Sequence, residues 1–204
     1  GYGNPTPIPA QAIPAIQMCR DVLGLAQTGT GKTASFTLPM IDALAGGRAK
    51  ARMPRSLILS PTRELAAQIS ENFVKYGKYH KQLSMALIVG GTSMDEQVRN
   101  IEKGVDVLIA TPGRLLDLYG RGKILLADIK IFVIDEADRM MDMGFEDDVR
   151  NILSFFTRQR QTLLFSATMP KKILDFAAQS LFDPVIVNVG RAGAASLDVV
   201  QEVI

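Results

Sequence analysis

Two short segments of the sequence combine residue types and spacings that suit a nucleoside triphosphate and its metal ion. The first, Gln27–Thr33, reads Gln-Thr-Gly-Thr-Gly-Lys-Thr and lies between an apolar run and a stretch with helical spacing, Ala34–Leu44. Its two glycines let backbone N–H groups curl around a phosphate, and the start of the helix adds partial positive charge. In such a loop Lys32 reaches the β- and γ-phosphates and the Thr33 hydroxyl binds Mg²⁺.

The loop departs from the strict phosphate-loop pattern, which has glycine where this chain has Ala26. The alternative is a turn rich in glycine and threonine that binds no ligand. An apolar strand before the loop and a helix after it favour the phosphate loop. The candidate nucleotide ligands are Gln27, Thr28, Gly29, Thr30, Gly31, Lys32 and Thr33.

The second segment is the acidic run Asp135-Glu136-Ala137-Asp138, which follows the apolar run Ile131–Ile134. Carboxylates at a strand tip can hold the Mg²⁺ of a bound nucleotide and can orient or deprotonate the attacking water. We assign Asp135 to Mg²⁺, through bridging waters, and Glu136 to the attacking water. A helix start that favours acidic residues is the alternative, but a phosphate loop in the same sheet argues against it. The predicted catalytic residues are Lys32, Asp135 and Glu136, and the predicted metal ligands are Thr33 and Asp135.

Three other apolar runs end in hydroxyl residues and a proline. Pro61-Thr62-Arg63 follows Leu57–Leu59, Thr111-Pro112-Gly113-Arg114 follows Val105–Ile109, and Ser166-Ala167-Thr168 follows Thr162–Phe165. Helix capping explains such residues, yet parallel strands would bring them to the sheet edge where α/β proteins bind ligands. Arg63 and Arg114 lie where helices begin, and the helix dipole does not favour cations there. Contact with a phosphodiester backbone would explain both arginines. Gly90-Gly91, after Ala86–Val89, provides either a close approach for such a backbone or a plain turn.

The elements that must position these motifs are seven short apolar runs, which alternate with stretches of helical spacing. The runs carry Val, Ile and Leu without polar alternation, which is typical of strands buried on both faces. Val22–Leu25 and Val185–Val189 complete the set. Helical spacing is seen at Leu65, Ile69, Phe73 and Tyr76, and again from Phe145 to Phe156. The alternation predicts an α/β fold, with a mostly parallel sheet of about seven strands and helices on both faces.

The composition argues against several other classes of protein. The 204 residues suffice for one domain with its own core. Hydrophobic residues make up 47% of the chain and charged residues 22%, a composition that argues against disorder. One cysteine and one histidine argue against a disulfide framework, a multi-cysteine zinc site and a Ser-His-Asp triad. A net charge of +2 is too small to indicate nucleic-acid binding by bulk charge. Since no apolar run is long enough to cross a bilayer, we expect no membrane partner and a cytoplasmic location, or a nuclear one in a eukaryote.

Six motifs occur in the order found in DEAD-box ATP-dependent RNA helicases, and the chain resembles that family over essentially its whole length. The motifs are Gln27–Thr33, Pro61–Ala66, Gly90-Gly91, Thr111–Arg114, Asp135–Asp138 and Ser166–Thr168. The resemblance implies a RecA-like fold of the P-loop NTPase class, with ATP and Mg²⁺ as cofactors. It also implies RNA-stimulated ATP hydrolysis and a second RecA-like domain that supplies further catalytic arginines.

The resemblance also assigns roles to the remaining motifs. It implies contacts to the RNA sugar-phosphate backbone, with little sequence preference, from Pro61, Thr62, Arg63, Gly90, Gly91, Thr111, Pro112, Gly113 and Arg114. It implies that Asp138, Ser166, Ala167 and Thr168 couple hydrolysis to strand separation, through hydrogen bonds that reach Asp138.

One position departs from the family pattern. The family's adenine-reading element is Pro-Thr-Pro-Ile-Gln, whereas here Pro5-Thr6-Pro7-Ile8 is followed by Pro9. Glutamine can form two hydrogen bonds with adenine, but proline has neither a polar side chain nor a backbone N–H. We therefore predict weakened adenine selectivity, the alternative being a substitution with little effect. Equal preference for ATP over GTP in this chain and in Pro9→Gln would refute the prediction.

Residues 1–189 are predicted to form the first RecA-like domain, with 1–14 as the altered adenine-reading element and 190–204 as the start of a linker. The absence of Met at Gly1 and the apolar run up to Ile204 predict a part of a longer protein. We expect a monomer that alone binds nucleotide weakly, hydrolyses it very slowly and does not unwind RNA. The alternatives are a P-loop enzyme with a small substrate, a DNA translocase of the same superfamily, and a non-catalytic docking module.

Overall fold

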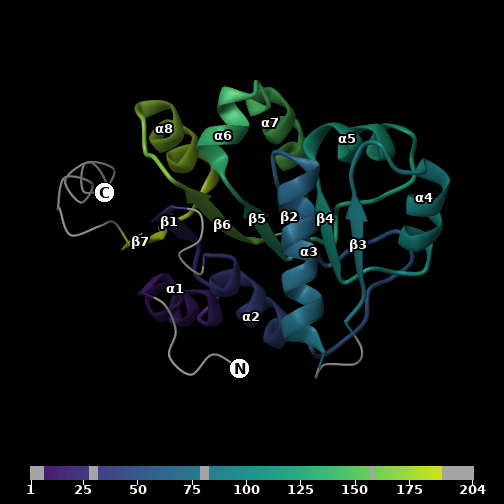
Figure 1. Ribbon diagram of the computed structural model, residues 1–204, viewed down its shortest axis with the longest axis horizontal. Coiled ribbons are helices and arrows are strands. Elements are labelled where there is room, and N and C mark those ends of the chain that lie inside the picture. The colour runs from purple at the N-terminus through teal and green to yellow at the C-terminus, as the bar shows by residue number, and fades with distance from the viewer. Residues whose placement is uncertain (1–6, 28–31, 79–82, 157–158, 190–204) are drawn as a thin grey trace.

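A computed structural model describes residues 7–27, 32–78, 83–156 and 159–189, apart from the side chains of residues 7–11 and 189. Strands and helices alternate along nearly the whole chain (Figure 1). The elements are α1 (Pro7–Gln17), β1 (Val22–Ala26), α2 (Lys32–Leu44), β2 (Ser56–Leu59), α3 (Arg63–Gly77), β3 (Met85–Ile88), α4 (Met94–Glu102), β4 (Val107–Ala110), α5 (Pro112–Gly120), β5 (Ile131–Ile134), α6 (Ala137–Asp142), α7 (Glu146–Ser154), β6 (Gln161–Ser166), α8 (Lys171–Ser180) and β7 (Val185–Val189).

These strands form one sheet in the order β3-β4-β2-β5-β6-β1-β7, and each neighbouring pair is parallel. The predicted parallel α/β fold is confirmed. Several strand ends differ from the prediction by one residue, and the largest difference is at β4, which begins at Val107 and not at Val105. Asp106 accounts for the difference, since its carboxylate binds the Arg55 guanidinium at 3.1 Å and accepts the Ser84 N–H at 3.0 Å. These polar contacts hold the residue before the strand in place.

Helices cover both faces of the sheet, as Figure 1 shows. One buried apolar cluster joins the sheet to α1, α2 and α3, and includes Phe36, Ile69 and Phe73. A second cluster joins the other face to the helices from α4 to α8. Within β2, Ile58 belongs to the first cluster and its neighbours Leu57 and Leu59 to the second. This alternation, with every β2 residue buried, explains why the strands are apolar without polar alternation.

The helices follow the predicted pattern with small shifts at their ends. Helix α2 begins at Lys32, two residues before the predicted start, so that the phosphate-loop lysine and threonine belong to its first turn. Helix α7 ends at Ser154, although the apolar spacing continues to Phe156. Among the described residues, no helix has both the length and the apolar character needed to cross a membrane.

Candidate nucleotide site and nucleic-acid interface

The strand order divides the carboxyl edge of the sheet into two halves. The neighbours β3, β4 and β2 lead into Gly90, Thr111 and Pro61, whereas β5, β6 and β1 lead into the acidic run, the Ser166–Thr168 segment and the phosphate loop. Pairing between β2 and β5 joins the halves. The motifs expected to bind nucleic acid and those expected to bind nucleotide therefore occupy adjacent halves of one edge.

Lys32 and Asp135 form a buried ion pair at the centre of the nucleotide half. Lys32 Nζ, at the start of α2, lies 2.9 Å from Asp135 Oδ1, just beyond β5. Only 5% of Lys32 and 3% of Asp135 is exposed to solvent. The two residues lie far apart in sequence, so their contact confirms that the phosphate loop and the acidic run share one edge.

The environment of Asp135 favours a cation beside its carboxylate. Burial raises the pKa of Asp135 above its ordinary value of 3.8, because desolvation penalises the charged form, and Lys32 opposes this effect. A carboxylate in such a site needs a partner charge to remain ionised. Lys32 is that partner here, and a metal ion would serve equally well.

The residues around this pair fit Mg²⁺ that arrives with a nucleotide. Thr33, half-buried, follows Lys32 in the first turn of α2. A threonine hydroxyl and an aspartate are the hard oxygen ligands that Mg²⁺ uses together with substrate phosphates. Among the described residues, no group of three or more His, Cys, Asp or Glu side chains could hold a metal alone. The donor set therefore suits a metal shared with phosphates and not a dedicated protein cage.

Glu136, the predicted water-orienting residue, has a left-handed backbone. Its φ and ψ are 53° and 54°, and it immediately precedes α6. Residues other than glycine rarely adopt this conformation, which costs about 1–2 kcal/mol. Glu136 follows the buried Asp135 in sequence, and its left-handed turn changes the chain direction between them. The two adjacent carboxylates therefore occupy different environments.

Ser166, Thr168 and Asp138 form the hydrogen-bonded network that the sequence analysis expects. The Asp138 N–H donates to Ser166 Oγ at 3.2 Å, and Ser166 Oγ donates to the Thr168 carbonyl at 2.7 Å. Both the N–H and the hydroxyl of Thr168 donate to Asp138 Oδ2, at 3.1 and 2.8 Å. The network joins the end of β6 to the start of α6, and Ala167 lies within the segment that it fixes.

In the other half of the edge, seven of the nine predicted nucleic-acid residues line one cavity of about 520 Å³, and Gly91 and Pro112 do not. Its lining includes Pro61, Thr62, Arg63, Gly90, Thr111, Gly113 and Arg114. Four further residues complete the wall: Glu64, Asp117, Met143 and Phe145. The sequence analysis missed these four, and for the last two the reason is clear, since they follow α6 and reach the cavity only through the fold.

Gly91 lies against Arg63, although the two residues follow different strands. Gly91 has a φ of +82°, and a Cβ built at this position would overlap Arg63 Nη1. The neighbouring Gly90 has open space where a Cβ would lie. The close neighbour of Gly91 is thus the Arg63 side chain, and both this neighbour and the backbone conformation require glycine here. Close approach of a nucleic-acid backbone to Gly90-Gly91 stays a prediction.

Gln97 holds Arg114 in place, a role that the sequence analysis did not identify. Arg114 Nη1 donates to Gln97 Oε1 at 3.2 Å and to the Thr92 carbonyl at 3.3 Å. Gln97 is buried, and its Nε2 donates to the Val89 carbonyl at 2.9 Å and to the Thr92 hydroxyl. A glutamine among the polar residues of α4 carries no local signal of this role.

Capping accounts for some of the strand-end hydroxyls and not for others. Thr62 caps α3, because its Oγ1 accepts the Leu65 N–H at 3.2 Å. Thr111 precedes α5 without a capping hydrogen bond from its side chain, which leaves its hydroxyl available to a ligand. Pro112 is buried at the first position of α5 and does not line the cavity, so it serves as a helix start.

Some predicted residues lie at or beyond the limit of what the structure describes. Gln27 is exposed directly after β1, whereas Thr28, Gly29, Thr30 and Gly31 lie outside the described residues. Pro9 belongs to the first turn of α1, where proline is tolerated, but its side chain is not described. The predicted linker, 190–204, also lies outside the described residues.

The DEAD/DEAH box helicase family model matches residues 6–176, and the chain belongs to this family. It is 50% identical to a probable ATP-dependent RNA helicase, ddx41, of Dictyostelium discoideum, over 100% of this chain and 32% of the relative. It is 48% identical to the ATP-dependent RNA helicase abstrakt of Drosophila melanogaster, over 100% of this chain and 34% of that protein. The chain thus spans about a third of the length of these relatives.

Solved structures confirm the RecA-like fold. The yeast DEAD-box splicing factor Prp28 superimposes with a TM-score of 0.86 at 36% identity, over 93% of this chain and 47% of Prp28. A hypothetical ATP-dependent RNA helicase from Sulfolobus tokodaii has a TM-score of 0.84 at 33% identity, over 93% of this chain and 54% of the other.

Proposed function

We propose that this chain is the first RecA-like catalytic domain of an ATP-dependent RNA helicase. It binds ATP with Mg²⁺ in one half of the sheet edge and the RNA sugar-phosphate backbone in the other. Coupling of hydrolysis to local strand separation requires a second RecA-like domain of the same protein, and the whole acts as a monomer. The observation that carries the proposal is the buried contact between Lys32 and Asp135, at 2.9 Å, beside the cavity lined by Arg63 and Arg114.

Nucleotide binding exchanges the partner of Asp135. Without nucleotide, Lys32 neutralises the buried carboxylate. When ATP binds, Lys32 turns to the phosphates. Mg²⁺ held by Asp135 and Thr33 would then supply positive charge that stabilises the negative charge of the phosphates. Glu136, which is half-buried, then orients the attacking water. Each buried charge keeps a partner throughout, which avoids the cost of an isolated carboxylate.

The RNA half supplies positioning contacts. Arg63 and Arg114 carry the positive charge, and Thr111 has an uncapped hydroxyl that can donate to a phosphate oxygen. In this proposal these groups contact phosphates and not base edges, which gives binding with little sequence preference. The acidic Glu64 and Asp117 in the same wall limit the net charge of the cavity, so we expect only a modest salt dependence of RNA binding.

Glu136→Gln tests the catalytic part of the proposal. In a single-turnover assay with the chain in excess over radiolabelled ATP and Mg²⁺, the unaltered chain should hydrolyse ATP slowly. Loss of a group that orients or deprotonates water should slow this hydrolysis by about 10²–10⁴-fold, whereas ATP affinity measured by calorimetry should stay unchanged.

Glu102→Gln, an exposed residue at the end of α4, serves as the matched control and should hydrolyse ATP normally. If the unaltered chain and Glu136→Gln hydrolyse ATP at the same rate, the assignment of Glu136 is wrong. If the chain binds no ATP at all, the docking-module alternative replaces the enzyme.

A further inference from the structure

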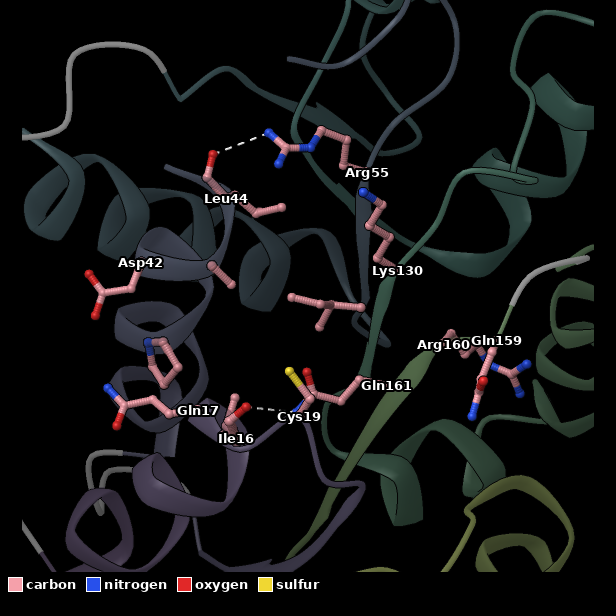
Figure 2. A pocket seen from close by; sticks show the side chains of 13 residues that line it. Ile16, Gln17, Cys19, Asp42, Leu44, Arg55, Lys130, Gln159, Arg160 and Gln161 are labelled. Carbon is pink, nitrogen blue, oxygen red and sulfur yellow. Dashed lines mark hydrogen bonds between the residues drawn. The ribbon is translucent and has the colours of Figure 1, made fainter. Parts of the chain in front are cut away.

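A second cavity lies at the amino edge of the sheet, opposite the edge described above. Its volume is about 730 Å³. Residues before or at the start of β2, β5 and β6 line it, together with the carboxyl-terminal parts of α1 and α2 (Figure 2). None of the residues assigned to ATP or RNA contributes to this lining.

The floor of the cavity is apolar. Pro39 and Ala43 of α2 face it one helical turn apart, and Ile16, Leu44 and Ile131 add further apolar surface. Cavities of about 300–1,000 Å³ with such a lining and a few polar groups are typical of small-molecule sites. A bare inorganic ion would leave this apolar surface in contact with water.

The charged side chains around the floor differ in whether they already have a partner. Lys130 is exposed and makes no ion pair with any described residue. Arg160 is half-buried, and its guanidinium carbon lies 5.1 Å from the centroid of the Phe156 ring, so this cation already has a partner. Arg55 is already paired with Asp106 at 3.1 Å. Asp42 is the one carboxylate in the described lining and lies across the cavity from Lys130 (Figure 2). Among the described residues of the lining, Lys130 is therefore the cationic group left for an anion.

Hydrogen bonds hold the walls in place without a ligand. Gln161 Nε2 donates to the carbonyls of Ile16 and Arg20, at 3.0 and 2.9 Å, and so fixes the end of α1. Arg55 donates to the Leu44 carbonyl at 3.1 Å and to the Gly46 carbonyl at 2.6 Å, and so fixes the end of α2. A pre-formed cavity loses little conformational entropy on binding.

We propose that this cavity binds a small organic anion with an apolar body, whose charged group faces Lys130 and whose body covers Ile16, Leu44 and Ile131. The site is separate from the nucleotide site, so ligand and ATP bind together. This inference does not depend on the proposed helicase function.

The fluorescent anion 8-anilinonaphthalene-1-sulfonate is a suitable probe, because it joins a sulfonate to an aromatic body. The sole cysteine of the chain, Cys19, is exposed and lines the cavity, so its alkylation by iodoacetamide reports occupancy at this position. We expect the probe to bind with enhanced fluorescence, to slow Cys19 alkylation, and to do both equally well with saturating ATP and Mg²⁺.

Substitutions test the two parts of the site. Lys130→Gln should weaken probe binding about fivefold, the effect of one lost ion pair, and Asp42→Asn should strengthen it. Ala43→Phe should fill the exposed side of the floor and abolish protection of Cys19. The matched controls, Lys103→Gln and Ala51→Phe, are exposed residues outside the cavity and should bind the probe normally. N-phenyl-1-naphthylamine, which lacks the sulfonate, should bind more weakly and be insensitive to Lys130→Gln.

Several results would overturn the proposal. Displacement of the probe by ATP would place it in the nucleotide site. Fluorescence enhancement without slower Cys19 alkylation would place it elsewhere on the surface. An equal effect of Lys130→Gln and Lys103→Gln would show that the anion does not face Lys130.

Discussion

Gly91 and Arg63 show how a single missing side chain can shape a binding surface. The glycine allows a φ of +82° and leaves room for the Arg63 guanidinium, which lines the cavity assigned to RNA. The adjacent Gly90 meets neither requirement, because its Cβ position is open. The two glycines therefore form a matched pair for mutation.

We predict that Gly91→Ala weakens RNA binding and Gly90→Ala does not. The added Cβ must displace the Arg63 guanidinium, so the affinity for single-stranded RNA should fall by up to about fivefold, the loss of one phosphate contact. Fluorescence anisotropy with labelled RNA measures the effect. The strained backbone should separately lower stability by about 1–2 kcal/mol. Equal affinities for the two variants would show that Arg63 does not contact RNA.

Asp135 predicts a pH dependence of metal binding. Its raised pKa means that the folded protein holds a proton on this carboxyl at pH values above 3.8, where an unfolded chain has lost it. Any stability from this protonation is present below 3.8 and lost as the pH rises through the raised pKa. Since Mg²⁺ needs the ionised form, metal binding must compete with the proton.

We therefore expect the Mg²⁺-dependent part of ATP affinity to fall as the pH is lowered through the raised pKa of Asp135. Calorimetric titration of the chain with ATP, with and without Mg²⁺, separates this part at each pH. Asp135→Asn has no proton to lose and should show only the pH dependence of ATP itself. An identical pH profile in both proteins would rule out Asp135 as the group that titrates.

At the scale of elements, β1 depends on a close approach to β6. Gly24 pairs in register with Phe165, and a Cβ at Gly24 would lie 2.5 Å from Phe165 Cδ1. Phe165 is fully buried and packs against Phe36, with the ring centroids 5.5 Å apart. Because Phe165 is fully buried, a shift of its ring must displace other core side chains. Both strands lead directly into the nucleotide half of the edge.

We predict that Gly24→Ala lowers the free energy of unfolding by about 1–3 kcal/mol, the cost of overpacking a core. Urea denaturation followed by circular dichroism measures the change. Gly46→Ala is the control, because Gly46 is exposed and has nothing within 4 Å of its Cβ position. A stability loss no larger than that of Gly46→Ala would mean that the sheet adjusts more easily than its packing indicates.

At the scale of the whole molecule, the strand order predicts separable binding functions. The nucleotide motifs follow β5, β6 and β1, and the RNA motifs follow β3, β4 and β2. Thr33→Ala should therefore weaken Mg²⁺-dependent ATP binding without changing RNA affinity. Arg114→Gln should weaken RNA binding about fivefold, the loss of one phosphate contact, without changing ATP affinity. Calorimetry and anisotropy on both variants test the separation, and a loss of both affinities in either variant would contradict it.

Local patterns of the sequence predict much of this architecture. Each apolar run is short, lacks polar alternation and precedes a helical stretch, so its strand type and parallel pairing follow from burial on both faces. The motif residues that end these runs, such as Asp135 and Thr111, must then reach one edge. For the same reason, the sequence sufficed to predict that the phosphate loop and the acidic run meet.

Only the tertiary structure decided which residues touch across that edge. The strand order placed β6 between β5 and β1, and so brought Asp135 to Lys32 and Asp138 to Thr168. It also set Gln97 behind Arg114 and formed the cavity near Lys130 at the opposite edge. These contacts join residues that are distant along the chain, and their geometry depends on how helices pack on the sheet. Local patterns along the chain do not determine that packing.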